Sequence, residues 1–425
     1  MNSSNSICIK EIVPNSKSVV INFSAGPELK RFFHQQSFFA EYDINIEAVP
    51  KSILVIPFLT NILPVAWANG IDIYVDELDC EFNEAVIDLK MAFKGLYPKL
   101  IKSNSNIIAN RIVENKKWTG ERTAQLFSGG LDSLATLVRK IDERPFLITI
   151  CGADVSLNDR ESWEIVQDYS KKIAEDTNTD VLFIKSNFKD FLNHSELEVK
   201  FGSIVNGWWT GVQHGLGLCG LSAPLTFAKE INAFYIASSH TSNYKLPYGS
   251  HPSTDNKLRW GSTRIIHEAY ELTRQQKVRV IANYIKSDYS SLQIRVCWRA
   301  GSNGGNCSQC EKCSRTIVGL LLEGIDPNGH GFRIDSHFPM HVRSQFESNA
   351  WKLDEAVAFQ WKDIQARIPE NTNTINEQYL ELFNWIQTYN FKDYQPGILL
   401  KAGGTVAKIL PAKQKKFIKS LIGME

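Results

Sequence analysis

AQLFSGGLDSLATLVRK, residues 124–140, joins a short apolar run to an amphipathic stretch through two serines, two glycines and an aspartate. The run TAQLF (123–127) predicts a β-strand, and SLATLVRKI (133–141) predicts an α-helix. The alternation continues, with further strands predicted at 145–151, 180–186 and 232–240 and helices at 159–177 and after Trp208. Short apolar strands that alternate with amphipathic helices are typical of a parallel sheet covered on both faces. The predicted fold class is therefore α/β, with a doubly wound parallel sheet.

The turn at 128–133 has the composition of an anion-binding site, because ligands of parallel sheets bind at the carboxyl ends of the strands. Gly129 and Gly130 allow a tight turn and a close approach to a ligand. The first N–H groups of the next helix favour a negative group, and Ser128 and Ser133 add hydroxyl donors. Asp132 is unfavourable beside bare phosphate, so we expect it to face a Mg²⁺ ion that bridges phosphates. No Gly-Lys-Ser/Thr follows, which excludes a Walker A loop; an ordinary helix N-cap is the alternative.

Four of the eight cysteines lie close together in the sequence CWRAGSNGGNCSQCEKC. Cysteine thiolates with this spacing can surround a Zn²⁺ ion, and an iron–sulfur cluster is the alternative. Four cysteine ligands would leave no open position on the metal, which predicts a structural site. Arg299, Lys312 and Arg315 would offset the negative charge of the thiolates. The predicted ligands are Cys297, Cys307, Cys310 and Cys313.

Length and composition limit the possible classes of protein. A chain of 425 residues is longer than one that usually forms a single hydrophobic core, so more than one domain is expected. We predict an α+β N-terminal domain at 1–118, an α/β domain with the cysteine motif at 119–325 and a helical extension at 326–425. The net charge of +1 gives no strong indication of a nucleic-acid or membrane partner, and we expect no direct nucleic-acid binding. No signal peptide or membrane-length apolar run is visible and the cysteines are clustered, so we expect a cytoplasmic protein with no membrane partner.

A second glycine-rich stretch, GLGLCG at 215–220, satisfies the G-x-G-x-x-G pattern of dinucleotide-binding proteins. That pattern has its usual meaning only where it opens a helix directly after a strand. Here it lies within a longer apolar run that begins near Trp208. We therefore expect close packing of a glycine-rich helix against the sheet and no nicotinamide site.

Ser-Gly-Gly-Leu-Asp-Ser between a strand and a helix resembles the pyrophosphate loop of the ATP pyrophosphatase (PP-loop) superfamily, which cleaves ATP between its α and β phosphates. With the later C-x₉-C-x₂-C-x₂-C motif, the chain resembles the 7-cyano-7-deazaguanine synthase (QueC) family over residues 120–320. This resemblance implies the adenine nucleotide α-hydrolase fold, with ATP, Mg²⁺ and Zn²⁺ as cofactors. It places Ser128, Gly129, Gly130, Asp132 and Ser133 on the ATP phosphates, Asp132 and Ser133 being catalytic, and zinc on the four cysteines.

The long N-terminal and C-terminal parts look like those of enlarged QatC-type members found in anti-phage defence cassettes. That resemblance implies an AMP-forming ligase. It would adenylate a 7-carboxy-7-deazaguanine-type acid and join it to an amine, here the N-terminus of a partner protein. The alternatives are a housekeeping nitrile synthase that uses ammonia, a tRNA-thiolating enzyme and a non-catalytic nucleotide sensor.

The substrate pocket is expected in residues 238–267, which follow a predicted strand and should emerge beside the loop. Asp255 could accept hydrogen bonds from a guanine-like base, Tyr248 or Trp260 could stack on it, and Arg264 could pair with its carboxylate. The remaining candidates, for hydrogen bonding or proton transfer, are His240, His251 and His267. An ordinary loop role is the alternative for each of these residues.

Overall fold

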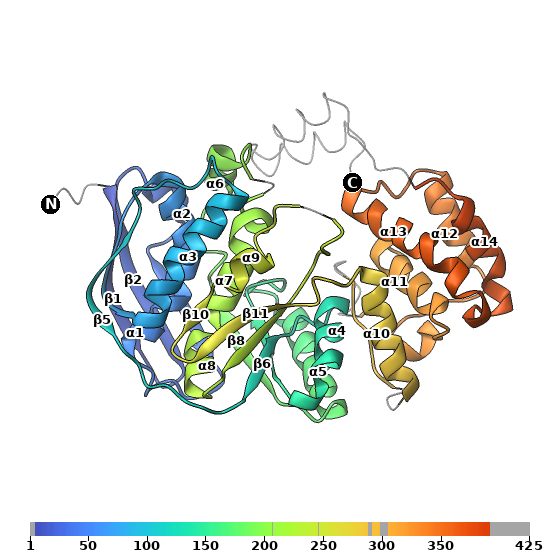
Figure 1. The fold of residues 1–425 in the computed structure, drawn as a ribbon, viewed down its shortest axis with the longest axis horizontal. Helices are drawn as coiled ribbons and strands as arrows, with labels where there is room; N and C mark the ends of the chain where they lie inside the picture. The colour runs from blue at the N-terminus through green and yellow to red at the C-terminus, as the bar shows by residue number, and fades with distance from the viewer. Residues whose placement is uncertain (1–4, 206, 245, 288–290, 298–304, 392–425) are drawn as a thin grey trace.

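The computed structural model in Figure 1 describes residues 5–205, 207–244, 246–287, 291–297 and 305–391. An 11-stranded sheet has the order β10-β11-β9-β6-β7-β8-β3-β2-β1-β4-β5. Its strands are β1 (Ile7–Pro14), β2 (Ser18–Ala25), β3 (Ser37–Tyr42), β4 (Ile73–Asp79), β5 (Ile107–Val113), β6 (Thr123–Leu126), β7 (Phe146–Cys151), β8 (Val181–Ser186), β9 (Ala233–Ala237), β10 (Arg259–Trp260) and β11 (Thr263–Glu268).

Five neighbouring strands, β11-β9-β6-β7-β8, pair in parallel throughout. From β6 the chain adds β7 and β8 on one side and then adds β9 and β11 on the other side. The connections therefore change direction between β6 and β9. At such a switch point the loops diverge and leave a crevice that can hold a ligand. The prediction of an α/β protein with a parallel sheet is confirmed for this part of the chain.

Helices cover both faces of the parallel strands, and β7 shows the alternation directly. Leu147 packs into a hydrophobic cluster with α4 (Leu131–Arg139), α5 (Arg160–Asp176), α10 (Arg274–Ser287) and α11 (Glu311–Leu322). The next residue, Ile148, packs into a second cluster with α2 (Ile56–Asn69), α7 (His214–Leu221) and α8 (Ala223–Ala228). Successive strand residues point to opposite faces, so both faces of β7 are buried.

The N-terminal strands continue the same sheet. The pairing of β3 with β8 is antiparallel and places Ala40 opposite Ser186 and Tyr42 opposite Ile184. Helices α1 (Lys51–Leu54), α2 and α3 (Cys80–Leu96) pack in the cluster that also contains α7 and α8. The boundary predicted at 118/119 therefore separates two segments that share one sheet and one hydrophobic cluster.

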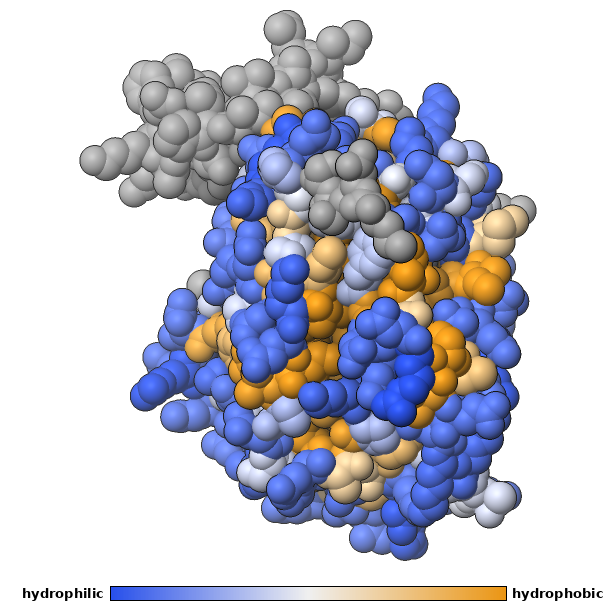
Figure 2. All heavy atoms as spheres, turned by 90° about the vertical axis from the view of Figure 1, so that its left-hand side faces the viewer, coloured by the Kyte–Doolittle hydropathy of each residue, from blue (hydrophilic) through white to orange (hydrophobic). Residues whose placement is uncertain are grey.

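On one face of the N-terminal strands, the described residues place no helix. Strands β1, β2 and β5 lie along the left of Figure 1, with the helices on their other side. Figure 2 shows this side, where hydrophobic side chains gather between polar ones. In β5, which ends the sheet, Ile108 is 39% exposed and Ile112 is 44% exposed. Strands β1, β2 and β3 pair antiparallel, whereas β4 pairs in parallel with β1 and β5, so this part of the sheet is mixed.

The stretch after Trp208 is predicted as one long helix and is instead divided. A π-helix (Trp209–Gln213) leads into α7, and Pro224 in the first turn of α8 starts a separate helix. The glycines of GLGLCG pack closely, but Gly217 and Gly220 lie against helix α2 and not against the sheet as predicted. A β-carbon on Gly220 would lie 1.9 Å from Oγ1 of Thr60, so the two helices approach too closely for any larger residue.

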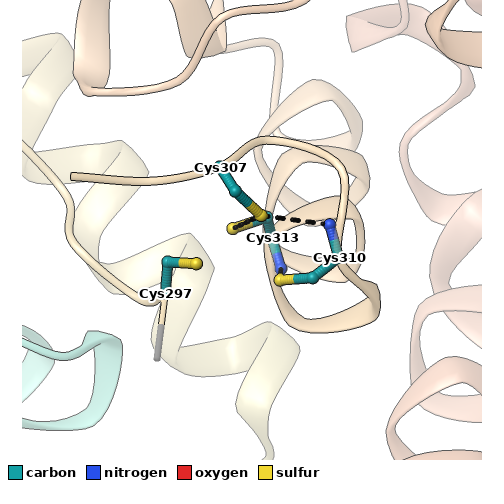
Figure 3. A group of neighbouring side chains, drawn as sticks. All are labelled: Cys297, Cys307, Cys310 and Cys313. Carbon is teal, nitrogen blue, oxygen red and sulfur yellow. Dashed lines mark hydrogen bonds between the residues drawn. The ribbon is translucent and has the colours of Figure 1, made fainter. Parts of the chain in front are cut away.

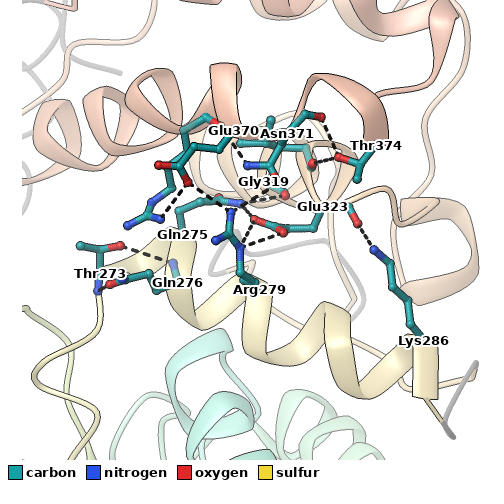
Figure 4. A network of polar contacts seen from close by, with 12 residues as sticks. Thr273, Gln275, Gln276, Arg279, Lys286, Gly319, Glu323, Glu370, Asn371 and Thr374 are labelled. Carbon is teal, nitrogen blue, oxygen red and sulfur yellow. Dashed lines mark hydrogen bonds and ion pairs between the residues drawn. The ribbon is translucent and has the colours of Figure 1, made fainter.

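The C-terminal part is helical, with α12 (Phe338–Glu347), α13 (Glu355–Arg367) and α14 (Leu380–Thr388); residues 392–425 of the predicted extension lie outside the described residues. Figure 4 shows the polar network that joins it to α10 and α11. The buried Glu323 accepts from Gln275 Nε2 (3.0 Å) and Arg279 Nε (3.2 Å), and Arg279 Nη2 donates to Asn371 (3.3 Å). Thr374 donates to the Leu322 carbonyl (2.8 Å). Among the described residues, no helix is long and apolar enough to cross a bilayer.

Candidate functional site

Residues 128–133 connect β6 to α4 at the switch point. Gly130 is the N-cap residue of α4, and no side chain caps this helix. Since the first N–H groups of a helix have no partner within it, those of α4 can donate to an anion. Ser133 Oγ donates to the Gly130 carbonyl (3.0 Å), and the Gly130 N–H donates to Ser128 Oγ (3.3 Å). The turn is thus ordered before any ligand arrives.

Tyr169 of α5 supports this turn from outside. Gly129 has a φ of +75°, in the left-handed region that favours glycine. The Tyr169 hydroxyl lies 3.3 Å from the Gly129 carbonyl and 2.9 Å from the Gln293 carbonyl. Burial raises the pKa of Tyr169, so the hydroxyl keeps its proton at neutral pH. Because Gln293 precedes Cys297 by only a few residues, Tyr169 links the turn to the segment that enters the cysteine cluster.

Asp132 forms ion pairs with two cationic side chains that no sequence motif predicts. Its carboxylate lies 3.0 Å from Lys277 Nζ and 3.5 Å from Arg274 Nη1. Lys277 also donates to the Ser238 carbonyl, directly after β9. Burial alone would raise the pKa of Asp132, but Lys277 and Arg274 outweigh it and lower that pKa. Asp132 therefore ties the loop after β6 to the loop after β9 across the switch point.

A pocket of about 670 Å³ opens at the carboxyl ends of β6, β7 and β9. This volume lies within the range of small-molecule sites. Most of the candidate phosphate-binding turn lines it: Ser128, Gly130, Asp132 and Ser133. Gln360 of α13 also lines it, so the C-terminal helical part contributes to the same pocket.

Four cations line the pocket: Arg274, Arg295, Lys312 and Arg315. Arg295 donates to the Ser128 carbonyl (3.4 Å). Burial, and then the charge of Arg315, lowers the pKa of Arg274 to about 10. Burial, and then the charge of Arg274, lowers the pKa of Lys312 to about 8. Both remain mainly protonated at neutral pH. Four acidic residues also line the pocket, Asp132, Asp154, Asp159 and Glu161, so the cations favour an anionic group only where they lie close to it.

Two apolar surfaces line the pocket. One comes from α5 and contains Trp163 and Val166. The other contains Ile150 of β7, Ile236 of β9, Trp209 and Leu218, which pack in the cluster that also holds α2 and α7. The pocket therefore offers apolar surface as well as charged groups, as small-molecule sites commonly do.

Of the seven substrate-binding candidates from the sequence, two lie at this site. Tyr248 lines the main pocket, and His240 lines a small neighbouring cavity together with Asp132. The rings of His240 and Tyr248 have centroids 4.6 Å apart. His214, which no motif marks, also lines the pocket, and its ring lies 5.4 Å from that of Tyr248. Burial lowers the pKa of His214 to about 4, so this ring is neutral at physiological pH.

Two further candidates form a buried pair behind the pocket. Asp255 accepts from Ser250 Oγ (2.7 Å) and pairs with His267 Nδ1 (2.8 Å), and the Asp255 and His267 side chains are each only 1% exposed. A β-carbon on Gly215 would lie 2.5 Å from Asp255 Oδ1, so α7 lies directly against this carboxylate. Neither residue lines the pocket, and Asp255 is not available to a base in this arrangement.

The other three candidates also lie away from the pocket. His251 caps the short helix α9 (Pro252–Asp255) and lies 3.2 Å from the Tyr270 hydroxyl. Trp260 is fully buried and donates from Nε1 to Thr226 (2.9 Å), so it cannot stack on a ligand here. Arg264 is exposed on β11. Residue type and position after a strand indicate these residues as substrate-binding candidates. The direction of each side chain depends on how the strands pack in the sheet, which the sequence does not show.

The four predicted cysteine ligands lie together (Figure 3), with their sulfur atoms all within 4.8 Å of one another. Cys307 Sγ and Cys313 Sγ are 3.9 Å apart. Tetrahedral zinc with Zn–S bonds of about 2.3 Å places its sulfurs about 3.8 Å apart, so this spacing fits the metal. The Cys310 N–H lies 3.3 Å from Cys307 Sγ and the Cys313 N–H lies 3.5 Å from Cys310 Sγ. The cluster can hold a metal ion such as zinc.

The cysteine cluster also positions part of the pocket. Cys310 is the N-cap residue of α11, Cys313 is in its first turn, and Cys297 itself lines the pocket. Lys312 and Arg315 lie on the same turn and line the pocket too, so the charges expected to balance the thiolates also face the anion-binding turn. Arg299 lies outside the described residues.

Comparison of the chain with protein-family models, with curated proteins and with solved structures finds no significant match. The residues and geometry of the pocket therefore carry the functional argument.

Proposed function

We propose that the protein is an ATP-dependent, AMP-forming ligase of the PP-loop type that resembles the QueC family. One observation carries this proposal: the Ser-Gly-Gly-Leu-Asp-Ser turn begins an uncapped helix at the switch point of a parallel sheet, inside a pocket lined by four cations. A helix N-terminus surrounded by cations suits the triphosphate of a nucleotide. The apolar surface of Trp163 and Val166 would then hold the adenine ring.

In the proposed reaction, a carboxylate oxygen of the second substrate attacks the α-phosphorus of ATP. The bond between this phosphorus and the bridging oxygen to the β-phosphate breaks, and pyrophosphate leaves with the electron pair. Negative charge grows on the leaving group, so the α4 N–H groups, the Ser128 and Ser133 hydroxyls and the pocket cations would stabilise the transition state. Asp132 would keep Lys277 and Arg274 in place for this step.

Mg²⁺ and zinc have separate places in this proposal. Asp132 and Asp154, two of the four acidic residues that line the pocket, could hold Mg²⁺ with the phosphates. Mg²⁺ bound there would reduce the repulsion between the phosphates and the attacking carboxylate. Zinc would be held by Cys297, Cys307, Cys310 and Cys313 and would order the start of α11.

The apolar surface that includes Trp209 suggests that the second substrate is a carboxylic acid with a flat ring. Trp209, His214 and Tyr248 approach one another there, with the Trp209 and His214 ring centroids 5.1 Å apart. His214 Nδ1 is buried and has no hydrogen-bond partner among the described residues, so it is available to a polar ring atom. A 7-carboxy-7-deazaguanine-type acid suits this surface. The adenylate would then pass its acyl group to an amine, either a protein N-terminus in a defence system or ammonia.

Incubation of the metal-loaded protein with ATP, Mg²⁺ and 7-carboxy-7-deazaguanine tests the proposal. We expect AMP and pyrophosphate in equal amounts, and an acylated amine when a partner protein or ammonia is supplied. Chromatography would measure AMP, and intact-mass spectrometry would detect a modified partner. A nitrile formed from ammonia alone would support the nitrile synthase instead. Release of ADP, or tight ATP binding with no AMP from any carboxylate, would contradict the proposed ligase.

A further inference from the structure

Strand β5 ends the sheet, and β4 is its only partner among the described residues. The Ile73 N–H of β4 donates to the Asn106 carbonyl (2.9 Å), directly before β5. Successive residues of a strand present their backbone groups to opposite edges, so every second residue of β5 has an N–H and a C=O on the free edge. These residues are Ile107, Ala109, Arg111 and Val113. No described residue forms a hydrogen bond with the backbone groups on this edge.

The strand also lacks the features that commonly keep an edge strand from pairing, which are short length, proline, lysine or a bulge. At the other end of the sheet, β10 has only two residues. Strand β5 has seven residues, with no proline or lysine, and it pairs with β4 in a constant register. Its one charged side chain, Arg111, forms an ion pair with Glu77 of β4. The free edge of β5 can therefore accept another strand.

Exposed apolar side chains gather beside this edge, on β5 and α3. Lys90 of α3 donates to the Ser103 carbonyl (3.0 Å), in the segment that leads into β5, so this side of α3 lies next to the strand. Nine large hydrophobic side chains are exposed among the described residues, and four of them belong to these two elements. The four are Ile87 (65% exposed), Met91 (64%), Ile108 (39%) and Ile112 (44%). Such a concentration marks an interaction surface.

We propose that β5 pairs with β5 of a second copy of the chain, antiparallel about a twofold axis at Asn110, so that one sheet runs through a homodimer. In this register Ala109 lies opposite Arg111 of the second copy, and both residues have their backbone groups on the free edge, as a hydrogen-bonded pair requires. A register centred on Arg111 would place two cations opposite each other. The twofold axis covers both free edges at once and gives a closed assembly.

The side chains of β5 complement themselves in this register, which is why the partner is a second copy. Ile108 lies opposite Ile112 of the second copy on the open face, so each exposed isoleucine gains an apolar neighbour. Arg111 faces an alanine and keeps its own Glu77. The axis is perpendicular to the sheet, so the two α3 helices lie on the same face and bring Ile87 and Met91 toward the joint. Contact between helices as well as strands suits the area that a stable dimer needs.

Analytical ultracentrifugation of the full chain tests this pairing. We expect the wild-type protein at about 50 μM to sediment with twice the mass of one chain. Ile108→Lys combined with Ile112→Lys puts like charges opposite each other across the axis, so this variant should be monomeric. Ile108→Lys combined with Ile112→Glu puts opposite charges there and should restore the dimer. Ile266→Lys, at a similarly exposed isoleucine of β11, should leave the dimer unchanged.

Asn110→Cys gives a second test that keeps the apolar side chains. The two introduced thiols would face each other at the axis, where the Cα spacing of about 4.5 Å permits a disulfide. Mild oxidation should therefore cross-link this variant, and not the wild type, into a dimer that a reductant separates on an electrophoresis gel. A monomeric wild type, a dimer that persists with both lysines, or a folded charge-swap variant that stays monomeric would overturn the pairing. Neither β5 nor α3 lines the pocket, so the result does not depend on AMP formation.

Discussion

A β-carbon on Gly129 would lie 2.6 Å from Cε1 of Tyr169, so the aromatic ring packs directly against the turn that we assign to phosphate binding. Gly129→Ala would force either the ring or the turn to move, and it would add strain at a φ of +75°. We expect the Kd for ATP, measured by calorimetry, to rise at least about tenfold. Gly95→Ala is the matched control because no atom lies within 4 Å of its added carbon. Equal ATP affinity in wild type and Gly129→Ala would contradict this role of the turn.

Loss of the metal should lower the thermal stability of the protein. We expect the purified wild-type chain to contain zinc in about one-to-one ratio and Cys310→Ser to have lost it, because three thiolates hold zinc less tightly than four. Elemental analysis measures the content, and thermal unfolding should show a lower Tm for the variant. Cys8→Ser, at a half-buried cysteine of β1 far from the cluster in the chain, should change neither value. A wild-type chain that contains iron or no metal would contradict the zinc assignment.

The ion pair between Asp132 and Lys277 predicts a specific pattern of stability. Lys277 is only 2% exposed, so Asp132→Asn would leave a buried cation with less compensation, and we expect the free energy of unfolding to fall by about 3 kcal/mol. Lys277→Met should be costly for the corresponding reason. The double variant should lose less than the sum of the two single losses, because neither charge is then left alone. Urea unfolding measures all four proteins, and strictly additive losses would show that the pair is not coupled.

His194 gives a pH dependence whose sign follows from its environment. Burial, and then nearby Lys189, lowers its pKa to about 4, whereas an unfolded histidine titrates near 6.5. Its contribution to stability is therefore complete above pH 6.5 and falls as the pH drops toward 4, because the unfolded chain takes up the proton first. Between pH 7.5 and 5.0 we expect His194 to contribute about 2 kcal/mol to the loss in the free energy of unfolding, besides the contribution of His214, whose pKa is also about 4. In His194→Gln this loss should be smaller; an unchanged pH profile would contradict the assignment.

The sequence predicts the parallel strands and the cysteine cluster because both signals are local. Strand β7 is a continuous apolar run, and three of the four cysteines lie within seven residues, from Cys307 to Cys313. The pairing of β3 with β8 has no such signal, because it joins residues about 145 positions apart through backbone hydrogen bonds that any side chains permit. The extent of the sheet therefore becomes visible only in three dimensions.

Many residues that line the pocket also cannot be identified from the sequence alone. Arg274 and Arg295 contribute charge to the pocket from segments without any motif, and only the folded chain brings them to the turn. Conversely, Asp255 and Trp260 follow the strand that ends at the pocket but point into the core, where a histidine and a threonine satisfy their polar atoms. A segment can be assigned to a site from sequence, but the direction of its side chains depends on packing partners far along the chain.

The pairing of β3 with β8 also gives the N-terminal strands a role, although the proposed reaction assigns them none. Without the first 118 residues, β8 would end the parallel sheet with a row of unpaired N–H and C=O groups. Such an exposed edge strand can pair with other chains and promotes aggregation. The N-terminal strands thus shield that flank, and a shortened gene product starting at residue 119 should precipitate when expressed. A protease cut between β5 and β6 should instead leave two fragments that stay bound to each other, since the break would fall in the connection and not in the shared core.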